Sequence, residues 1–255
     1  MHTPTQSEQS EGGERPTSAG SAWARAGRGI VPDTLRNRHT SRVPVALLVA
    51  AALAAVGDWI AVHLRLFRLE YVLKPLTPVL LAIATATADL GDPKPWVIGA
   101  LVFGLLGDIG LMLSVGRTDP PFLAGLGAFL IGHIWYVVAF AVTGLRALHL
   151  LAGVLIVAGV AGLALPAVLR GAARSAGRTF ALVVGGYAAL LATMAALAVG
   201  TGIVATAIGG VLFLISDTLI ARNRFVGPVP HADVLVIVTY HLAQFLIVIG
   251  LIAAA

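Results

Sequence analysis

The sequence contains no cysteine, and charged residues are scarce. Without cysteine the chain can form neither disulfide bonds nor the zinc and iron–sulfur sites that depend on thiolate ligands. Charged residues make up 11% of the chain and hydrophobic residues 58%. Soluble globular domains average roughly 25% charged and 45–50% apolar residues. The composition therefore excludes an ordinary soluble domain and indicates an integral membrane protein.

The formal net charge of +5 at pH 7 could suggest a nucleic-acid partner. The arginines, however, lie in the N-terminal segment and in polar breaks between apolar runs, and they form no continuous stripe. Basic groups that flank apolar segments are typical of a membrane protein beside anionic lipid. We therefore expect contact with the bilayer and no nucleic-acid partner.

The first 43 residues differ in composition from the rest of the chain. They are rich in Ser, Thr, Gly, Pro and Arg and contain few bulky apolar side chains. Such a segment buries too little apolar surface to fold, so residues 1–43 are predicted to be a disordered tail. The first apolar run begins near Pro44 and is long enough to stay in the membrane, unlike a secretory signal. Residues 44–255 are predicted to form one transmembrane domain.

From Pro44 onward, apolar runs of roughly 17–23 residues alternate with short polar breaks, and a helix of this length crosses a ~30 Å hydrocarbon layer. The breaks contain turn-forming sequences such as GDPKP at 91–95 and GRTDPP at 116–121. The sequence therefore predicts an all-α, polytopic membrane helical bundle of about eight transmembrane helices, at 44–64, 72–88, 95–115, 122–143, 148–170, 179–199, 202–221 and 232–254.

Arginines are distributed unevenly between the two ends of this bundle. The breaks after the first, third, fifth and seventh predicted helices are rich in arginine, whereas the alternate breaks contain only Lys94 and Arg146. The positive-inside rule then places the odd-numbered breaks in the cytoplasm, although the arginines of the tail favour the opposite orientation. We expect a multi-pass protein of a bacterial inner membrane with the odd-numbered breaks in the cytoplasm.

Polar side chains within the predicted helices gather at one depth. Asp108 and Asp217 lie past the midpoints of the third and seventh helices, which run in the same direction. A carboxylate at mid-helix costs ~2.5–3.5 kcal/mol or more in the bilayer, so these two are candidates for function. Other helices add polar groups to the same half of the membrane: Asp58, His63, Lys74, His133, Tyr136, Tyr240, His241 and Gln244. The pattern predicts a polar cavity between the helices.

Several of these residues also have a structural explanation. Gly104 and Gly107 share a helical stripe with Asp108, and such glycines commonly allow a neighbouring helix to approach closely. Asp58 is more readily explained as a carboxylate that packs between helices. His63 and His241 are more readily explained by interhelical hydrogen bonds. Other residues, such as Lys74, can extend an amine toward the membrane surface.

Five motifs resemble the YhhN family, also called the TMEM86 or lysoplasmalogenase family. They are YVLKPL (71–76), GLLGDIGLM (104–112), FLIGHIWY (129–136), FLISDTLIARNRF (213–225) and YHLAQ (240–244). The resemblance covers residues 44–255. It implies hydrolysis of the vinyl ether bond of lysoplasmalogens, which releases a fatty aldehyde and a glycerophospho-ethanolamine or -choline. It also implies that the carboxylates matching Asp108 and Asp217 are the catalytic pair.

Vinyl ether hydrolysis requires an acid and a nearby negative charge, because a proton is transferred to the β-carbon and an oxocarbenium ion forms. Two carboxylates in one low-dielectric layer titrate as a coupled pair, so one can stay protonated while the other is ionised. We expect no metal or organic cofactor. Lys74 and loop arginines could hold the phosphate of a lysophospholipid substrate. The other polar candidates would bind or orient the substrate or water: His133, Tyr136, Ser216, Asn223, Tyr240 and Gln244.

Two other classes of function fit parts of the pattern. A secondary transporter also carries Asp, Lys and His within its helices, and the similar intervals from Asp108 to His133 and from Asp217 to His241 could reflect a repeat. A zinc-dependent membrane lipid hydrolase could use histidines 63, 133 and 241 with one of the aspartates. No paired-histidine motif supports the zinc hypothesis.

Overall fold

The computed structural model describes residues 33–114 and 120–255. Residues 1–32 of the predicted tail and residues 115–119 of one predicted break lie outside the described residues. From His39 to Ala255 the chain forms one compact unit. All regular secondary structure in the described ranges is helical, which confirms the predicted fold class.

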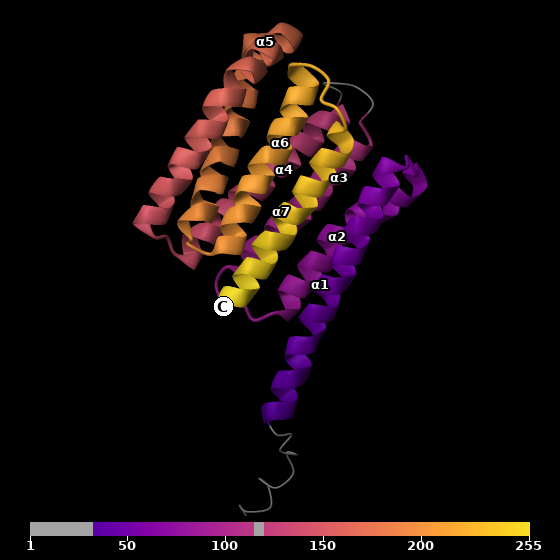
Figure 1. Ribbon diagram of the computed structural model, residues 1–255, viewed down its shortest axis with the longest axis vertical. Coiled ribbons are helices and arrows are strands. Elements are labelled where there is room, and N and C mark those ends of the chain that lie inside the picture. The colour runs from indigo at the N-terminus through magenta and orange to yellow at the C-terminus, as the bar shows by residue number, and fades with distance from the viewer. Residues whose placement is uncertain (1–32, 115–119) are drawn as a thin grey trace, which may run out of the picture. The chain divides into compact units, whose positions relative to one another are not determined.

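The described residues form seven helical elements (Figure 1): α1 (Asp33–His63), α2 (Phe67–Thr87), α3 (Lys94–Met112), α4 (Pro120–Thr143), α5 (Ala147–Gly200), α6 (Val204–Phe225) and α7 (Ala232–Ala254). Each is long and apolar enough to cross a membrane, and in α1 the apolar part is Pro44–His63. The protein is therefore an integral, multi-pass membrane protein, as its composition predicts.

Helix α5 consists of two antiparallel arms. As a straight helix its 54 residues would extend ~80 Å, far more than a ~30 Å hydrocarbon layer requires. The backbone leaves the helical conformation at Ala176 and Gly177, and the φ of +85° at Gly177 is one that glycine adopts readily. Gly185 then lies against the side chain of Leu169, so the arms run side by side, as the left of Figure 1 shows. The arms correspond to the predicted helices 148–170 and 179–199, so about eight membrane-crossing segments are present in the described residues.

Elements α2 to α7 pack in a closed ring. Each contacts the next element in the sequence, and α7 returns to contact α2. Helix α1 joins this ring through side chains: Leu73 of α2 lies against Gly57, and the Trp59 Nε1–H donates a hydrogen bond to Nδ1 of His241 in α7 (3.2 Å). This arrangement gives the helices a common interior, where polar groups that are far apart in the sequence can meet.

The glycines near Asp108 allow α4 to approach α3 closely, which confirms the role predicted for this stripe. A Cβ added at Gly107 would lie 2.6 Å from the ring of Phe129, and one at Gly110 would lie 2.5 Å from the Cα of Gly125. Neither separation can be tolerated without a shift of the neighbouring atoms, so larger side chains would force the two helices apart. The close approach brings α4 and its polar residues beside α3.

Candidate active site

Asp108 is held in the interior of the ring by α7. The hydroxyl of Tyr240 donates a hydrogen bond to Oδ2 of Asp108 (2.8 Å), and Nε2 of Gln244 donates to that hydroxyl (2.9 Å). All three side chains are buried. A Cβ at Gly104 would lie 2.9 Å from Nε2 of Gln244, so the glycine leaves the room that these side chains need. Three of the predicted site residues therefore form one hydrogen-bonded group.

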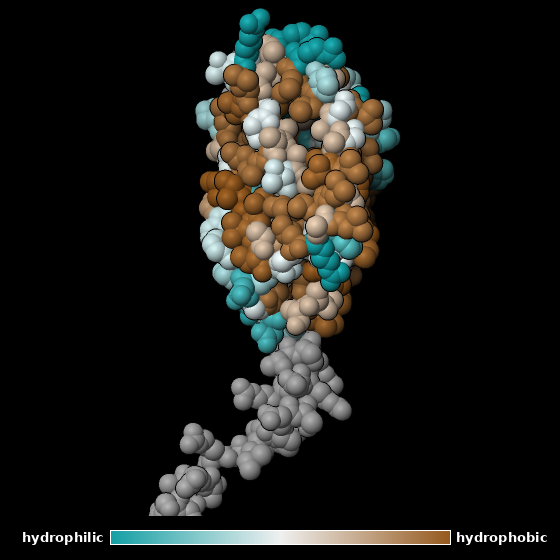
Figure 2. Space-filling view, turned by 90° about the vertical axis from the view of Figure 1, so that its left-hand side faces the viewer, coloured by the Kyte–Doolittle hydropathy of each residue, from teal (hydrophilic) through white to brown (hydrophobic). Residues whose placement is uncertain are grey.

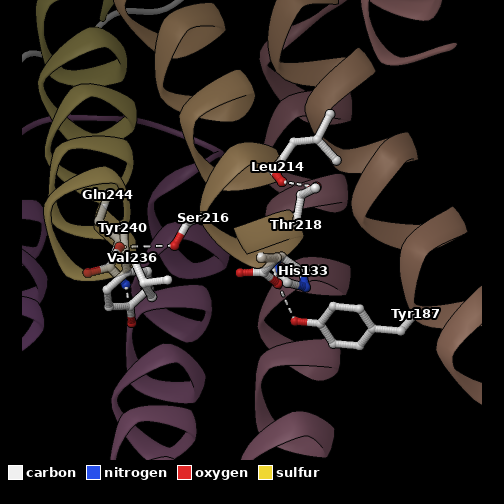
Figure 3. A network of polar contacts seen from close by, with 9 residues as sticks. His133, Tyr187, Leu214, Ser216, Thr218, Val236, Tyr240 and Gln244 are labelled. Carbon is white, nitrogen blue, oxygen red and sulfur yellow. Dashed lines mark hydrogen bonds and ion pairs between the residues drawn. The ribbon is translucent and has the colours of Figure 1, made fainter. Parts of the chain in front are cut away.

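Asp217 is held by side chains from two other elements. The hydroxyl of Tyr187, on the second arm of α5, donates to Oδ2 of Asp217 (2.5 Å). Nε2 of His133 lies 4.0 Å from the same oxygen. Figure 3 shows Tyr187 and His133 converging from different helices. Both ring nitrogens of His133 are buried and have no hydrogen-bond partner among the described residues, so they can bond to a small polar molecule.

The surroundings of the two carboxyl groups are in contact with each other. The ring of Phe213 packs edge to face against His133 (centroids 4.9 Å apart) and against Tyr240 (5.4 Å). It therefore connects the group around Asp108 to the group around Asp217. The two carboxyl groups are also close enough to interact electrostatically. The sequence predicts this proximity, and the structure adds that each carboxyl group has its own tyrosine donor.

Lys74 lies on the α1 side of the site. It is partly buried, and its charge is close enough to interact with Asp58, Asp108 and His241. Asp58 is fully buried, and neither carboxyl oxygen has a hydrogen-bond partner among the described residues. Lys74 therefore lies among buried carboxyl groups, where it can balance their negative charge.

A cavity of about 180 Å³ lies between α4, the two arms of α5 and α6. Asp217 and Tyr187 provide polar groups in its wall, and Arg224 lines it nearer the C-terminal end of α6. Most of the remaining wall is aliphatic or aromatic, as at Val160, Ala192 and Phe122. Lys74 and Asp108 do not line this cavity. The site therefore combines a carboxyl group with an adjacent apolar space.

The other predicted site residues lie at the edge of this arrangement. Tyr136 is buried beside Phe213 (ring centroids 6.1 Å apart), and its hydroxyl has no hydrogen-bond partner among the described residues. Ser216 donates to the carbonyl of Val236 (3.1 Å) and so connects α6 to α7. Asn223 is exposed, and its Oδ1 accepts a hydrogen bond from the Val229 N–H (3.1 Å) in the following loop. The orienting roles assigned to these three residues stay predictions.

The sequence analysis did not identify Tyr187. It is the single tyrosine in the predicted helix 179–199, which is otherwise mainly aliphatic. A tyrosine hydroxyl buried in an apolar surrounding usually has a hydrogen-bond partner, and this rule would have marked the position. Which residue was the partner could not be read from the sequence, since α5 and α6 meet only through tertiary packing.

We expect replacement of Tyr187 with Phe to lower the free energy of unfolding by about 1–3 kcal/mol, because the partly buried Asp217 would lose its hydrogen-bond donor. The matched control is Tyr71→Phe. The Tyr71 hydroxyl donates to the carbonyl of Met112 (3.0 Å) at an exposed position, where water can replace the donor. The measurement is the thermal unfolding midpoint of each variant in one detergent. Equal decreases for the two variants would contradict a special role of the bond between Tyr187 and Asp217.

The polar groups of the site are suited to proton transfer. Among the described residues, no group of three or more His, Cys, Asp and Glu side chains is arranged to hold a metal ion. His63 is exposed at the end of α1, and His133 and His241 belong to different hydrogen-bonding and packing groups. Two carboxyl groups, two tyrosine hydroxyls and an imidazole can instead donate, accept and position protons.

Comparison with known proteins agrees with this description. The family model described as the YhhN family matches residues 69–251. Lysoplasmalogenase TMEM86B of Sus scrofa is 35% identical over 152 residues, 58% of this chain and 60% of that protein. Lysoplasmalogenase TMEM86A of Homo sapiens is 33% identical over 164 residues, 59% of this chain and 62% of that protein. The chain thus covers less than two thirds of the length of these relatives. No solved structure matches it significantly. The family model covers most of the membrane domain, and the chain belongs to the YhhN family.

Proposed function

We propose that the protein is an ether hydrolase that cleaves the vinyl ether bond of lysoplasmalogens or similar lysophospholipids. The products would be a fatty aldehyde and a glycerophospho-ethanolamine or -choline. The observation that carries the proposal is a pair of carboxyl groups, each bound by a tyrosine: Asp108 is buried, and Asp217 is partly buried and lines an apolar cavity. The similarity to proteins named lysoplasmalogenases supports the same reaction.

The reaction begins with transfer of a proton to the β-carbon of the vinyl ether. The C=C electron pair forms the new C–H bond, and the ether oxygen stabilises the resulting cation as an oxocarbenium ion. Water then adds to the carbon attached to oxygen and loses a proton, which returns to the carboxylate. The hemiacetal breaks its C–O bond to give the aldehyde and the free glycerol hydroxyl. One water molecule is consumed, and the acid is regenerated.

Asp217 is our candidate for the proton donor, because it is the aspartate that lines the cavity. General acid catalysis of this kind typically contributes ~10²–10⁴-fold to the rate. Asp108, bound by Tyr240, would supply fixed negative charge near the developing cation. The ring nitrogens of His133 have no hydrogen-bond partner among the described residues, and since one of them lies beside Asp217, His133 is suited to orient the attacking water. None of these steps requires a metal or an organic cofactor.

The assay that tests this proposal measures aldehyde release by the purified protein in detergent. We expect release from a lysoplasmalogen both with and without EDTA, since carboxyl groups supply the acid. A matched lysophospholipid with a saturated ether chain should release no aldehyde, because it has no double bond to protonate. Activity that disappears on chelation and returns with Zn²⁺ would contradict the mechanism. Absence of aldehyde release under every condition would contradict the function.

We also propose that the protein lies in a bacterial inner membrane with the arginine-rich end of its bundle in the cytoplasm. The support is the concentration of arginines at one end of the bundle: Arg65 lies in the loop after α1, Arg68 and Arg222 lie at the adjoining ends of α2 and α6, and Arg174 lies where α5 reverses. The substrate would then enter the site from the half of the bilayer next to this end.

A further inference from the structure

We propose that the cavity between α4, α5 and α6 binds a lysophospholipid lengthwise, with its phosphate on Arg224, its vinyl ether at Asp217 and the start of its single chain between the arms of α5. This inference rests on the proposed function and adds to it a phosphate subsite and a direction of binding. It assigns to Arg224 the recognition of the head group.

The spacing along α6 supports this placement. Asp217, Ala221 and Arg224 all line the cavity, at intervals that keep them on one face of a helix. Positions 217 and 224 are two helical turns apart, roughly 10 Å. In a lysoplasmalogen the phosphorus is seven bonds from the β-carbon that accepts the proton, and because an extended zigzag chain advances roughly 1.25 Å per bond, this distance is roughly 9 Å. The side chains can close the difference, and the small Ala221 between them leaves space for the glycerol.

Arg224 has the geometry of a phosphate-binding group. Its guanidinium carbon lies 3.6 Å from the centroid of the Phe122 ring, and both residues line the cavity. Stacking on an aromatic ring fixes the plane of a guanidinium through its face, whereas phosphate is bound by the N–H groups at its edge. Arg224 also lies in the last turn of α6, the end of the helix at which the phosphates of surrounding lipids are expected. Position and charge therefore both suit an anionic head group.

The apolar part of the cavity suits the start of an alkenyl chain. Beyond Asp217, toward the middle of the helices, the wall is formed by Val160, Leu191, Ala192 and Leu214. The outer face of α5 exposes apolar side chains such as Leu163 (89% exposed) and Leu182 (76%). Figure 2 shows this face as mainly hydrophobic, with hydrophilic residues at its upper end and a hollow just below them. A cavity of about 180 Å³ holds only part of a lipid, so the rest of the chain would extend into the bilayer.

Lys74, the other candidate for the phosphate, is less suitable. It does not line the cavity, and its charge interacts with Asp58 and Asp108 on the α1 side of the site. A phosphate there would lie near two carboxyl groups. The cavity therefore favours Arg224 as the head-group partner.

The first test compares Arg224→Gln with Arg222→Gln, since Arg222 lies on the same helix but is exposed and does not line the cavity. Each enzyme is assayed on a lysoplasmenylethanolamine and on the 1-O-alkenylglycerol of the same chain length, which lacks the phosphate. Loss of a charge-assisted hydrogen bond should raise KM for the phospholipid about 10- to 100-fold in Arg224→Gln, with little change in kcat. Its KM for the alkenylglycerol and both constants of Arg222→Gln should stay near those of the unmodified protein. Equal increases in KM on the two substrates, or no increase, would overturn the phosphate subsite.

A binding measurement separates this inference from the proposed function. The probe is a lysophosphatidylethanolamine with a saturated ether chain, which has no bond for the reaction to cleave. The probe should raise the thermal unfolding midpoint of the unmodified protein and of Arg222→Gln. The increase for Arg224→Gln should be much smaller. This difference without any turnover of the vinyl ether would support the subsite and reject the reaction. Turnover together with equal stabilisation of all three proteins would support the reaction and reject the subsite.

The direction of the chain is tested by Ala192→Phe, with Ala158→Phe as the matched control. Ala192 lines the apolar part of the cavity, whereas Ala158 is exposed and does not line it. The new ring at position 192 should lower kcat/KM at least about tenfold on the phospholipid and the alkenylglycerol alike, because both carry the chain. Equal activities of the two folded variants would overturn the placement of the chain.

Discussion

Replacing Asp217 with Asn is expected to reduce the rate of aldehyde release by ~10²-fold or more while leaving the protein folded. Asn has almost the same size and can still accept a hydrogen bond from Tyr187, so the packing around position 217 should persist. The amide cannot act as a carboxylic acid toward the vinyl ether, and it carries no negative charge. The measurement is kcat in detergent, together with size-exclusion behaviour and the thermal unfolding midpoint.

Two further Asp→Asn variants serve as controls. Asp233 is exposed in the first turn of α7, so its replacement should change neither rate nor stability appreciably. Asp58 is as deeply buried as Asp108 but belongs to the α1 side of the bundle, so its replacement should affect the rate less than Asp217→Asn. Near-normal turnover of Asp217→Asn with a lowered unfolding midpoint would mean that this carboxyl group connects helices and does not act in the reaction.

The depth of the site could be predicted from the sequence, because depth follows from the rise per residue along a helix. Asp108 and Asp217 lie in the C-terminal halves of α3 and α6. Short loops make consecutive membrane crossings antiparallel, so the third and seventh crossings run in the same direction, and the shared half of the membrane required no tertiary information. The reversal in α5 was predictable for a related reason. The polar segment RGAARSAGR at 170–178 interrupts an apolar run that is long enough for two crossings.

The lateral neighbours of each residue could not be predicted in this way, because they depend on which helices are adjacent in the ring. The contact of Tyr187 with Asp217 requires the second arm of α5 to pack beside α6. Lys74 shares the predicted depth with Asp217 but faces Asp58 and Asp108, since α2 packs against α3 and α7. The contacts of Phe213 with His133 and Tyr240 could not be predicted either, because a phenylalanine in an apolar helix does not differ in the sequence from any other core residue.

The variant with both Asp108→Asn and Asp217→Asn is expected to lose little more activity than either single variant. If the two carboxyl groups acted independently, their losses would multiply, so two ~10²-fold losses would become ~10⁴-fold. Groups that act as one unit are instead strongly non-additive, because removal of either already disables the shared step. Two observations support treating the two carboxyl groups as one unit. Phe213 contacts both Tyr240 and His133, and the carboxyl groups are close enough to interact electrostatically.

The measurement is a cycle of four proteins, namely the unmodified chain, both single variants and the double variant, assayed for kcat on one lysoplasmalogen. Asp58→Asn combined with Asp217→Asn provides the matched comparison, in which the effects should multiply because Asp58 has no part in the shared step. Multiplicative losses for the Asp108 and Asp217 pair would contradict the single unit. In that case Asp217 would be the acid by itself, since it lines the cavity and Asp108 does not. Asp108 would be a separate buried charge that affects the reaction only through the surrounding side chains.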